Sequence, residues 1–283
     1  MSAITSAIRQ SIRPSIRSSF GGTPDQLQAL ITSLFSAGEQ GAIYIPRPIV
    51  NGVQSLFQDA AGTTLVTADG DPVGLMIDQS GNGNHATQSM LAARPIYQTD
   101  GTLHWLQFDG VSDFMETAAI DFTGTDKMTV VAGLRKLADP STAILLEHGL
   151  PPNYDTLLNA PRRGTSLSYG SDMRDGTSTS TVGVTGFNAP VSSVVTSQMD
   201  YSGATIVEQI KIRVNSIAVN NISEGSVVSG NFKEAVLFVG ARGSSSLHFE
   251  GNVYSIAIRG TETAAPDLAR LEQYLAGLSG VTL

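Results

Sequence analysis

The chain contains no cysteine, few lysines and few charges of either sign. Cysteine is absent from all 283 residues, lysine occurs only at Lys127, Lys136, Lys211 and Lys233, and charged residues make up 15% of the sequence. Without cysteine there is no disulfide framework, no thiolate metal site and no cysteine nucleophile. The formal net charge of −8 argues against a nucleic-acid-binding protein, because such proteins need a basic surface.

Long apolar runs are also missing. The apolar segments have the length of strands and fall well short of the ~18 residues that cross a bilayer, so we expect no membrane insertion. Hydrophobic residues nevertheless make up 41% of the chain, which is enough for a folded core.

Residues 1–22 differ in charge from the rest of the chain, since they contain three arginines and no acid. Isoleucine or phenylalanine recurs every four residues, and Pro14 argues against one continuous helix. We interpret this segment as an arm that anchors the chain on a partner through Ile4, Ile8, Arg9, Ile12, Arg13, Ile16, Arg17 and Phe20. The alternatives are an arm packed on its own domain or a targeting sequence; a secretory signal is disfavoured because there is no apolar core of that kind.

Residues 23–38 predict an amphipathic helix. Thr23, Pro24 and Gln26 form the pattern of a capped helix start, and Gly38 provides a stop. The apolar residues at helical spacing are Leu27, Leu30, Ile31, Leu34 and Phe35. We interpret this stripe as a core or oligomer contact.

The apolar period changes to two from about residue 41 onward, which predicts strands. The expected strands are 103–108, 128–134, 142–147, 165–169, 191–199, 204–214, 217–222, 235–240 and 247–259. No helices alternate with these strands, so an antiparallel sandwich or jelly roll is favoured over a parallel sheet. In 204–214, Glu208 breaks the alternation and suggests a bulge. Residues 39–283 are expected to form one domain that ends in a helix beginning at Pro266.

Three segments resemble the concanavalin A-like, laminin-G-like jelly rolls. They are DQSGNGNHAT at 78–87, LQFDGVSDFM at 106–115, and the closing segment 237–258 with its G-x-R and F-x-G patterns. The resemblance implies an all-β, antiparallel two-sheet jelly-roll sandwich. We expect Asp78 and Asp113 to accept hydrogen bonds from backbone amides in tight turns rather than to bind a metal.

Residues 1–115 are similar to a group of tailed-bacteriophage virion proteins. The arm, the Gly21-Gly22 joint, the helix and the segments 56–64 and 66–74 carry this resemblance. It implies a structural protein of the tail tip or baseplate, or alternatively a capsid decoration protein, that displays a lectin-like domain and is assembled in the host cytoplasm. The expected partners are other virion proteins and copies of the chain itself, with a trimer favoured.

No residue pattern predicts catalysis, a metal or a cofactor. Retaining glycosidases need two carboxylates close together. Asp69 and Asp71 have a suitable spacing, but they lie in a turn before Pro72. The four histidines are scattered and form no ligand pair. We therefore expect the chain not to be an enzyme; a glycan-cleaving enzyme of the same fold and a secreted lectin are the alternatives.

A glycan-binding module is better supported. Segment 149–176 is rich in turns, and its Tyr, Asp and Arg side chains can stack on sugars and form hydrogen bonds with them. The residues predicted to contact a ligand are Tyr154, Asp155, Arg162, Arg163, Tyr169, Asp172 and Arg174. A solvated loop or a subunit contact is the alternative for this segment. We assign Trp105, which lies in an expected strand, to the core rather than to a sugar platform.

Overall fold

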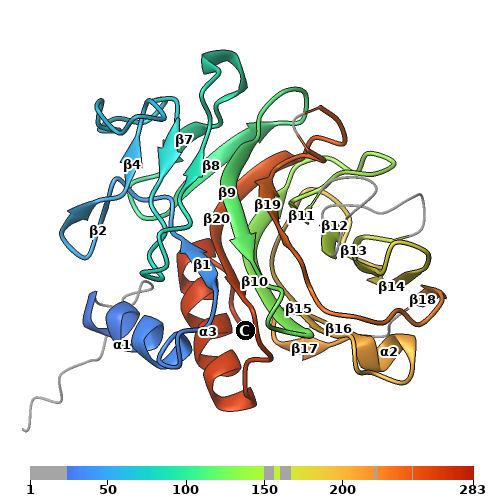
Figure 1. The fold of residues 1–283 in the computed structure, drawn as a ribbon. Helices are drawn as coiled ribbons and strands as arrows, with labels where there is room; N and C mark the ends of the chain where they lie inside the picture. Colours follow the sequence, from blue (N-terminus) through green and yellow to red (C-terminus); the bar gives the residue numbers. More distant parts are fainter. Residues whose placement is uncertain (1–23, 150–155, 160–166, 220–221, 244) are drawn as a thin grey trace, which may run out of the picture.

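The computed structural model describes residues 24–149, 156–159, 167–219, 222–243 and 245–283 (Figure 1). The predicted anchoring residues Ile4 to Phe20 lie outside this range, so the function of the arm stays a prediction. Among the described residues, no helix has both the length and the apolar character needed to cross a bilayer.

Two antiparallel sheets form a sandwich. In the eight-stranded sheet the order is β17-β16-β15-β10-β20-β8-β7, and β1 pairs with one end of β20 beside β8. Its strands are β1 (Gly41–Tyr44), β7 (Ile96–Thr99), β8 (His104–Asp109), β10 (Lys127–Lys136), β15 (Val191–Asp200), β16 (Ile210–Val214), β17 (Ile217–Ala218) and β20 (Glu250–Arg259).

The second, ten-stranded sheet has the order β18-β14-β13-β12-β11-β19-β9-β6-β5-β4. Its strands are β4 (Leu56–Phe57), β5 (Leu75–Met76), β6 (Ala86–Thr87), β9 (Met115–Asp121), β11 (Leu146–His148), β12 (Thr156–Asn159), β13 (Tyr169–Arg174), β14 (Thr179–Val184), β18 (Ile222–Gly225) and β19 (Glu234–Val239). A separate hairpin pairs β2 (Ile49–Val50) with β3 (Val53–Gln54). The predicted all-β sandwich is confirmed.

The main core lies between the two sheets. Period-two alternation directs one side chain in two inward, for example Val130, Ala132 and Leu134 along β10, and these residues are buried. Inward side chains of the ten-stranded sheet, such as Val182 and Val239, belong to the same apolar cluster. Burial of this apolar surface is the main favourable contribution to folding.

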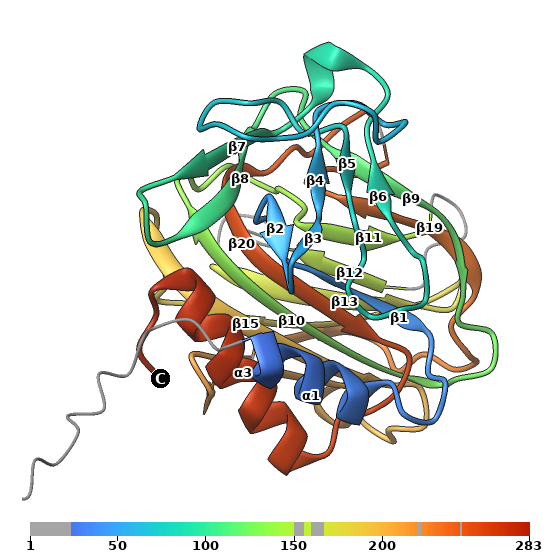
Figure 2. The same cartoon turned by 90° about the vertical axis from the view of Figure 1, so that its left-hand side faces the viewer.

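A second core lies on the outer face of the eight-stranded sheet, where helices α1 (Pro24–Leu34) and α3 (Ala265–Ser279) pack side by side (Figure 2). The α1 stripe that includes Leu27, Leu30 and Leu34 is buried against α3 and the sheet. The predicted stripe is therefore a core contact. The helix ends at Leu34, and Gly38, with a φ of 78°, follows in the left-handed region.

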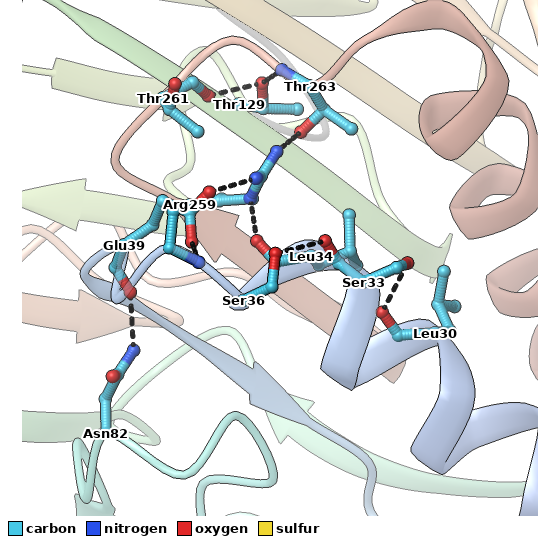
Figure 3. A network of polar contacts seen from close by, with 11 residues as sticks. Leu30, Ser33, Leu34, Ser36, Glu39, Asn82, Thr129, Arg259, Thr261 and Thr263 are labelled. Atoms are coloured by element: carbon cyan, nitrogen blue, oxygen red, sulfur yellow. Dashed lines mark hydrogen bonds and ion pairs between the residues drawn. The ribbon is translucent and has the colours of Figure 1, made fainter.

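Arg259 at the end of β20 holds α1 in place (Figure 3). Its guanidinium donates hydrogen bonds to the Leu34 carbonyl at the end of α1 and to the Thr263 hydroxyl, and forms an ion pair with Glu39 at 2.6 Å. The Glu39 carbonyl in turn accepts a hydrogen bond from Asn82 at 3.1 Å. These contacts attach the helix to the sandwich rather than leaving it as a free linker.

The segment predicted as one strand at 204–214 contains a helical turn. Helix α2 (Ile206–Gln209) precedes β16, and Thr205 and Glu208 form a reciprocal capping box. The Glu208 carboxylate accepts the Thr205 N–H at 2.9 Å, and the Thr205 hydroxyl accepts the Glu208 N–H at 3.3 Å. The bulge prediction at Glu208 was wrong because these capping bonds stabilise a helix start.

The turn at 78–84 has the structure expected from its sequence. The Asp78 carboxylate accepts the N–H groups of Ile43 at 2.9 Å and Ser80 at 2.8 Å. Gly81 and Gly83 have φ angles of 93° and 79°. The structural assignment of Asp78 is confirmed.

Candidate ligand-binding face

The predicted loop site is only partly described. Tyr154, Asp155, Arg162 and Arg163 lie outside the described residues. Tyr169 is fully buried in the core, where its hydroxyl donates to the Ser193 hydroxyl at 3.0 Å and Lys136 lies over its ring. Burial raises the pKa of Tyr169. Because Tyr169 points inward on β13, its ring cannot contact a surface ligand, and this part of the prediction is corrected.

Asp172 and Arg174 lie on the outer face of the ten-stranded sheet, since Met173 between them points into the core. The Asp172 carboxylate is 1% exposed. It accepts a hydrogen bond from the Thr181 hydroxyl at 2.8 Å and pairs with Arg174 at 3.3 Å. These two predicted residues therefore contact each other in a buried network.

Glu147 extends this network across the sheet. It is in register with Asp172 through the intervening strand β12, and its side chain is 0% exposed. It pairs with Arg242 at 3.1 Å and accepts the Gly243 N–H at 2.9 Å. Burial raises the pKa of Glu147, and the nearby guanidinium of Arg242 opposes this shift. These contacts of Glu147 attach the segment that follows β19 to the sheet.

A different polar surface lies on the outer face of the eight-stranded sheet. Along β8, Leu106 and Phe108 belong to the core, so Trp105 and Gln107 point to the other side. Trp105 is half-buried and Gln107 is exposed. The assignment of Trp105 to the core was wrong, because Trp105 alternates with the inward-facing residues.

Two neighbouring strands add to the same face. On β20, Val253 points into the core, which places Asn252 and Tyr254 on the outer side. On β10, Leu134 is in the core and Arg135 is outside and exposed. The outer face of the sheet therefore carries aromatic, amide and guanidinium groups together.

Strand register brings these side chains into two rows. Arg135, Asn252 and Gln107 are directly opposite one another on three adjacent strands. In the next row, the Trp105 and Tyr254 rings have centroids 5.7 Å apart and planes inclined by 53°. We call this surface the aromatic–amide face; its members are Gln98, Trp105, Gln107, Arg135, Asn252 and Tyr254.

Helix α3 ends before it reaches this face. A Cβ atom added at Gly133 would lie 2.0 Å from the Ser279 hydroxyl, so the last turn of α3 rests on Gly133 and on Ser255, its partner in β20. Tyr254 and Asn252 lie further along β20, beyond the helix end. Figure 2 looks onto this sheet, with α1 and α3 across one part of it and β7 and β8 at the other side.

Several polar groups on the aromatic–amide face have unused hydrogen-bonding capacity. Asn252 is 9% exposed, and its Oδ1 atom is buried without a hydrogen-bond partner. Within the described part of the chain, the side chains of Gln98, Gln107 and Arg135 form no hydrogen bond or ion pair. The exposed Gln107 and Arg135 side chains are therefore free to form hydrogen bonds with a ligand.

This arrangement can hold a flat, hydroxyl-rich molecule. An aromatic ring supplies an apolar platform, while amide and guanidinium groups donate to and accept from ring substituents. The groups come from strands far apart in sequence, so no local motif marked them. The available signal was the alternation of Trp105 with Leu106 and Phe108.

No protein-family model matches the chain, and no curated protein matches it. Solved structures do match. They include a Trypanosoma rangeli sialidase in complex with the inhibitor DANA (15% identity, 90% of this chain and 37% of that chain, TM-score 0.47). An arabinofuranosidase complexed with arabinofuranosyl-alpha-1,2-xylobiose matches at 10% identity over 88% of this chain and 65% of that chain, with a TM-score of 0.50. The botulinum neurotoxin serotype D ligand-binding domain in complex with N-acetylneuraminic acid matches at 9% identity over 86% and 52%, with a TM-score of 0.53.

The chain spans less than two thirds of the length of each of these structures. At these identities the similarity shows a shared fold. The prediction that the chain is not an enzyme is contradicted by this comparison, because an arabinofuranosidase shares the fold. A sugar-binding toxin domain also shares it.

Proposed function

We propose that this chain is a glycan-binding protein and that the aromatic–amide face holds the sugar. One observation carries the proposal: the Trp105–Tyr254 ring pair lies beside the exposed side chains of Gln107 and Arg135, which form no hydrogen bond or ion pair within the described part of the chain. Sugar-binding toxin domains of the same fold are consistent with this function.

Binding would combine stacking with hydrogen bonds. The apolar face of a pyranose ring packs on Trp105, which Tyr254 supports from the neighbouring strand. The exposed amide of Gln107 supplies a donor and an acceptor for ring hydroxyl or acetamido groups beside the stacked ring. Because the side chains lie on paired strands, the site is largely formed before the ligand arrives.

A glycan array with the full chain tests the proposal, followed by titration calorimetry on the best ligand. We expect Trp105→Ala to weaken binding by ~10-fold or more, since the loss of one stacking platform costs about 1–3 kcal/mol. Gln107→Ala should weaken binding through the lost amide donor and acceptor.

The matched control is Ile217→Ala, which removes an exposed apolar side chain on β17, at the opposite edge of the same sheet. It should leave the affinity unchanged. The absence of binding to any glycan, or equal affinity of the wild type and folded Trp105→Ala, would contradict the proposed function.

Glycoside hydrolysis is a second candidate function, favoured by one observation on the opposite sheet. Glu147 and Asp172 are in register two strands apart on one face, which places their Cα atoms ~10 Å apart. Inverting glycosidases use two carboxyl groups ~6.5–9.5 Å apart, and a substrate here would have to displace the arginines that pair with these two buried carboxylates. The raised pKa of Glu147 suits a general acid.

Release of reducing sugar from the glycans that bind tests this candidate. Glu147→Gln and Asp172→Asn should each abolish turnover; because each variant also removes the charge partner of an arginine, circular dichroism at the assay temperature must show that it is folded. Unchanged turnover in both variants would exclude these two carboxylates as the catalytic pair.

We further propose that residues 1–22 attach the glycan-binding body to a phage virion, at the tail tip or baseplate. Helix α1, which follows the arm in the sequence, packs on the sandwich and so belongs to the body that the arm would attach. Deletion of residues 1–22 should leave a folded domain, measured by circular dichroism, and abolish incorporation into particles. Normal incorporation of the deletion variant would contradict this placement. Mass photometry tests the proposed trimer.

A further inference from the structure

Nearly every cationic side chain in the described residues has a partner. Eight Lys and Arg side chains of the described residues pair with carboxylates, for example in Lys127–Asp200, Lys211–Glu262 and Arg259–Glu39, and Arg94 donates to backbone carbonyls. Within the described part of the chain, only Arg47 and Arg135 form neither a side-chain hydrogen bond nor an ion pair. In a chain of net charge −8, two unpaired arginines require an explanation.

Arg135 belongs to the aromatic–amide face. It is exposed on β10 and stands opposite Asn252, which is itself opposite Gln107. The three Cα atoms therefore span ~10 Å across the sheet, which is the width of about two sugar rings. The Arg135 guanidinium can therefore reach one sugar ring of a ligand whose adjacent ring lies on Trp105.

Arg47 lies on the other side of the ring pair. Strand β1 pairs with residues 256–259 of β20, and β8 pairs with residues 250–253, so the chain leaves the sheet after Tyr44 close to Tyr254. Burial, and to a smaller extent the charge of Arg47, lowers the pKa of His104, the residue before Trp105. The charge of Arg47 also opposes the rise that burial causes in the pKa of Tyr274 on α3.

The acids near this face leave the arginines available. Asp109, at the end of β8, accepts the N–H groups of Val111 at 2.8 Å, Ser112 at 2.8 Å and Asp113 at 3.0 Å. The Asp109 carboxylate is therefore bound by backbone N–H groups of its own turn. Glu250 is exposed and lies opposite Asp109. It lies two residues before Asn252 on β20 and therefore on the same face of the sheet.

From these positions we infer that the aromatic–amide face selects a glycan that carries a carboxylate, with Arg135 as its partner and Arg47 adding positive potential beyond Trp105. This inference rests on the proposed glycan binding. A planar guanidinium can donate two parallel hydrogen bonds to a carboxylate, which is the strongest form of this contact. The exposed Gln107 amide, in the same row as Arg135, fixes the orientation of the same ligand through its hydroxyl or N–H groups.

The experiment compares carboxylated glycans with their neutral forms. Sialyllactose and trigalacturonate, each beside its carboxyl-reduced derivative, are titrated into the full chain at two salt concentrations. We expect one of the two acids to bind ~10-fold tighter than its reduced form, with the difference falling at high salt. The two acids distinguish the class of sugar that supplies the carboxylate.

The variants separate charge from folding. Arg135→Gln should lower affinity for the acid ~10-fold and leave the reduced form unchanged, and Arg135→Lys should restore part of the loss. Arg47→Gln should cause a smaller loss, and Glu250→Gln a small gain. Arg270→Gln, which removes an exposed α3 charge paired with Asp267, is the control and should change nothing.

The outcomes separate this inference from the proposed function. If the reduced glycans bind as tightly as the acids and Arg135→Gln has no effect, carboxylate selection is overturned while sugar binding at Trp105 stands. If Trp105→Ala does not weaken binding of either form, the site itself is wrong and both proposals fall.

Discussion

Replacement of Asp113 by asparagine should stabilise the protein at neutral and alkaline pH. Asp113 lies in the turn between β8 and β9 and is 6% exposed. Its Oδ2 accepts the Asp109 N–H at 3.0 Å, and burial together with the Asp109 charge raises its pKa to about 7. Asparagine keeps an acceptor oxygen of the same size and cannot ionise, so the hydrogen bond can persist.

The direction of the pH dependence follows from the raised pKa of Asp113. The folded protein binds the Asp113 proton more tightly than the unfolded chain, whose pKa is near 4. Stability from this group is therefore complete below pH ~4 and is lost as the pH rises toward 7. A shift from 3.8 to about 7 corresponds to at most ~4 kcal/mol, because one pKa unit equals 1.36 kcal/mol. Relaxation of the turn reduces this limit, and we expect about 2 kcal/mol at pH 8.

Urea unfolding of wild type and Asp113→Asn at pH 4, 6 and 8 measures the effect. The two proteins should have similar free energies of unfolding at pH 4, and the variant should gain progressively at pH 6 and pH 8. If the variant is destabilised equally at all three pH values, Asp113 acts through hydrogen bonding alone and the charge argument is refuted.

Two further predictions concern the outer face of the eight-stranded sheet. Gly133→Ala should lower the free energy of unfolding by about 1–3 kcal/mol because the new methyl group meets the Ser279 hydroxyl at 2.0 Å, and Ser279→Ala should recover part of this loss. Arg259→Gln should cost about 2–3 kcal/mol and increase amide exchange in α1, because the helix loses its ion pair and its carbonyl contact. Urea titrations and hydrogen-exchange mass spectrometry check both predictions, and unchanged exchange in α1 would refute the role assigned to Arg259.

The long strands could be predicted from sequence because their alternation is uninterrupted. The expected strand at 128–134 corresponds to β10, Lys127–Lys136, and the expected strand at 191–199 to β15, Val191–Asp200. Strand β1 was missed because all four of its residues are buried and no alternation exists. Strand β14, Thr179–Val184, is rich in Thr, Ser and Gly, so its apolar period is weak.

The candidate site could not be predicted in the same way. Only the pairing of three strands brings Arg135, Asn252 and Gln107 together. Asn252 is more than a hundred residues from the other two in the sequence. The acid pair on the other sheet was missed for a related reason. Spacing in the sequence predicts only carboxylates that lie close together along one strand, whereas Glu147 and Asp172 are aligned across three strands. Register is a tertiary property, and local patterns do not encode it.

The part of the eight-stranded sheet that carries Arg135 and Gln107 differs from the ion-paired surfaces of both sheets, which include Arg213–Glu272 on β16, and this contrast indicates which surface is available for recognition. On the ten-stranded sheet, Glu147 and Asp172 are buried with arginine partners, and removal of one partner of such a pair is costly. On the eight-stranded sheet, Asn252 and Arg135 have no protein partner although folding brings them into one row. Satisfied polar groups stabilise the sandwich, whereas unsatisfied ones lower its stability and are compensated only when a ligand binds. The face with the unmet polar groups is therefore the place where binding would release the most free energy.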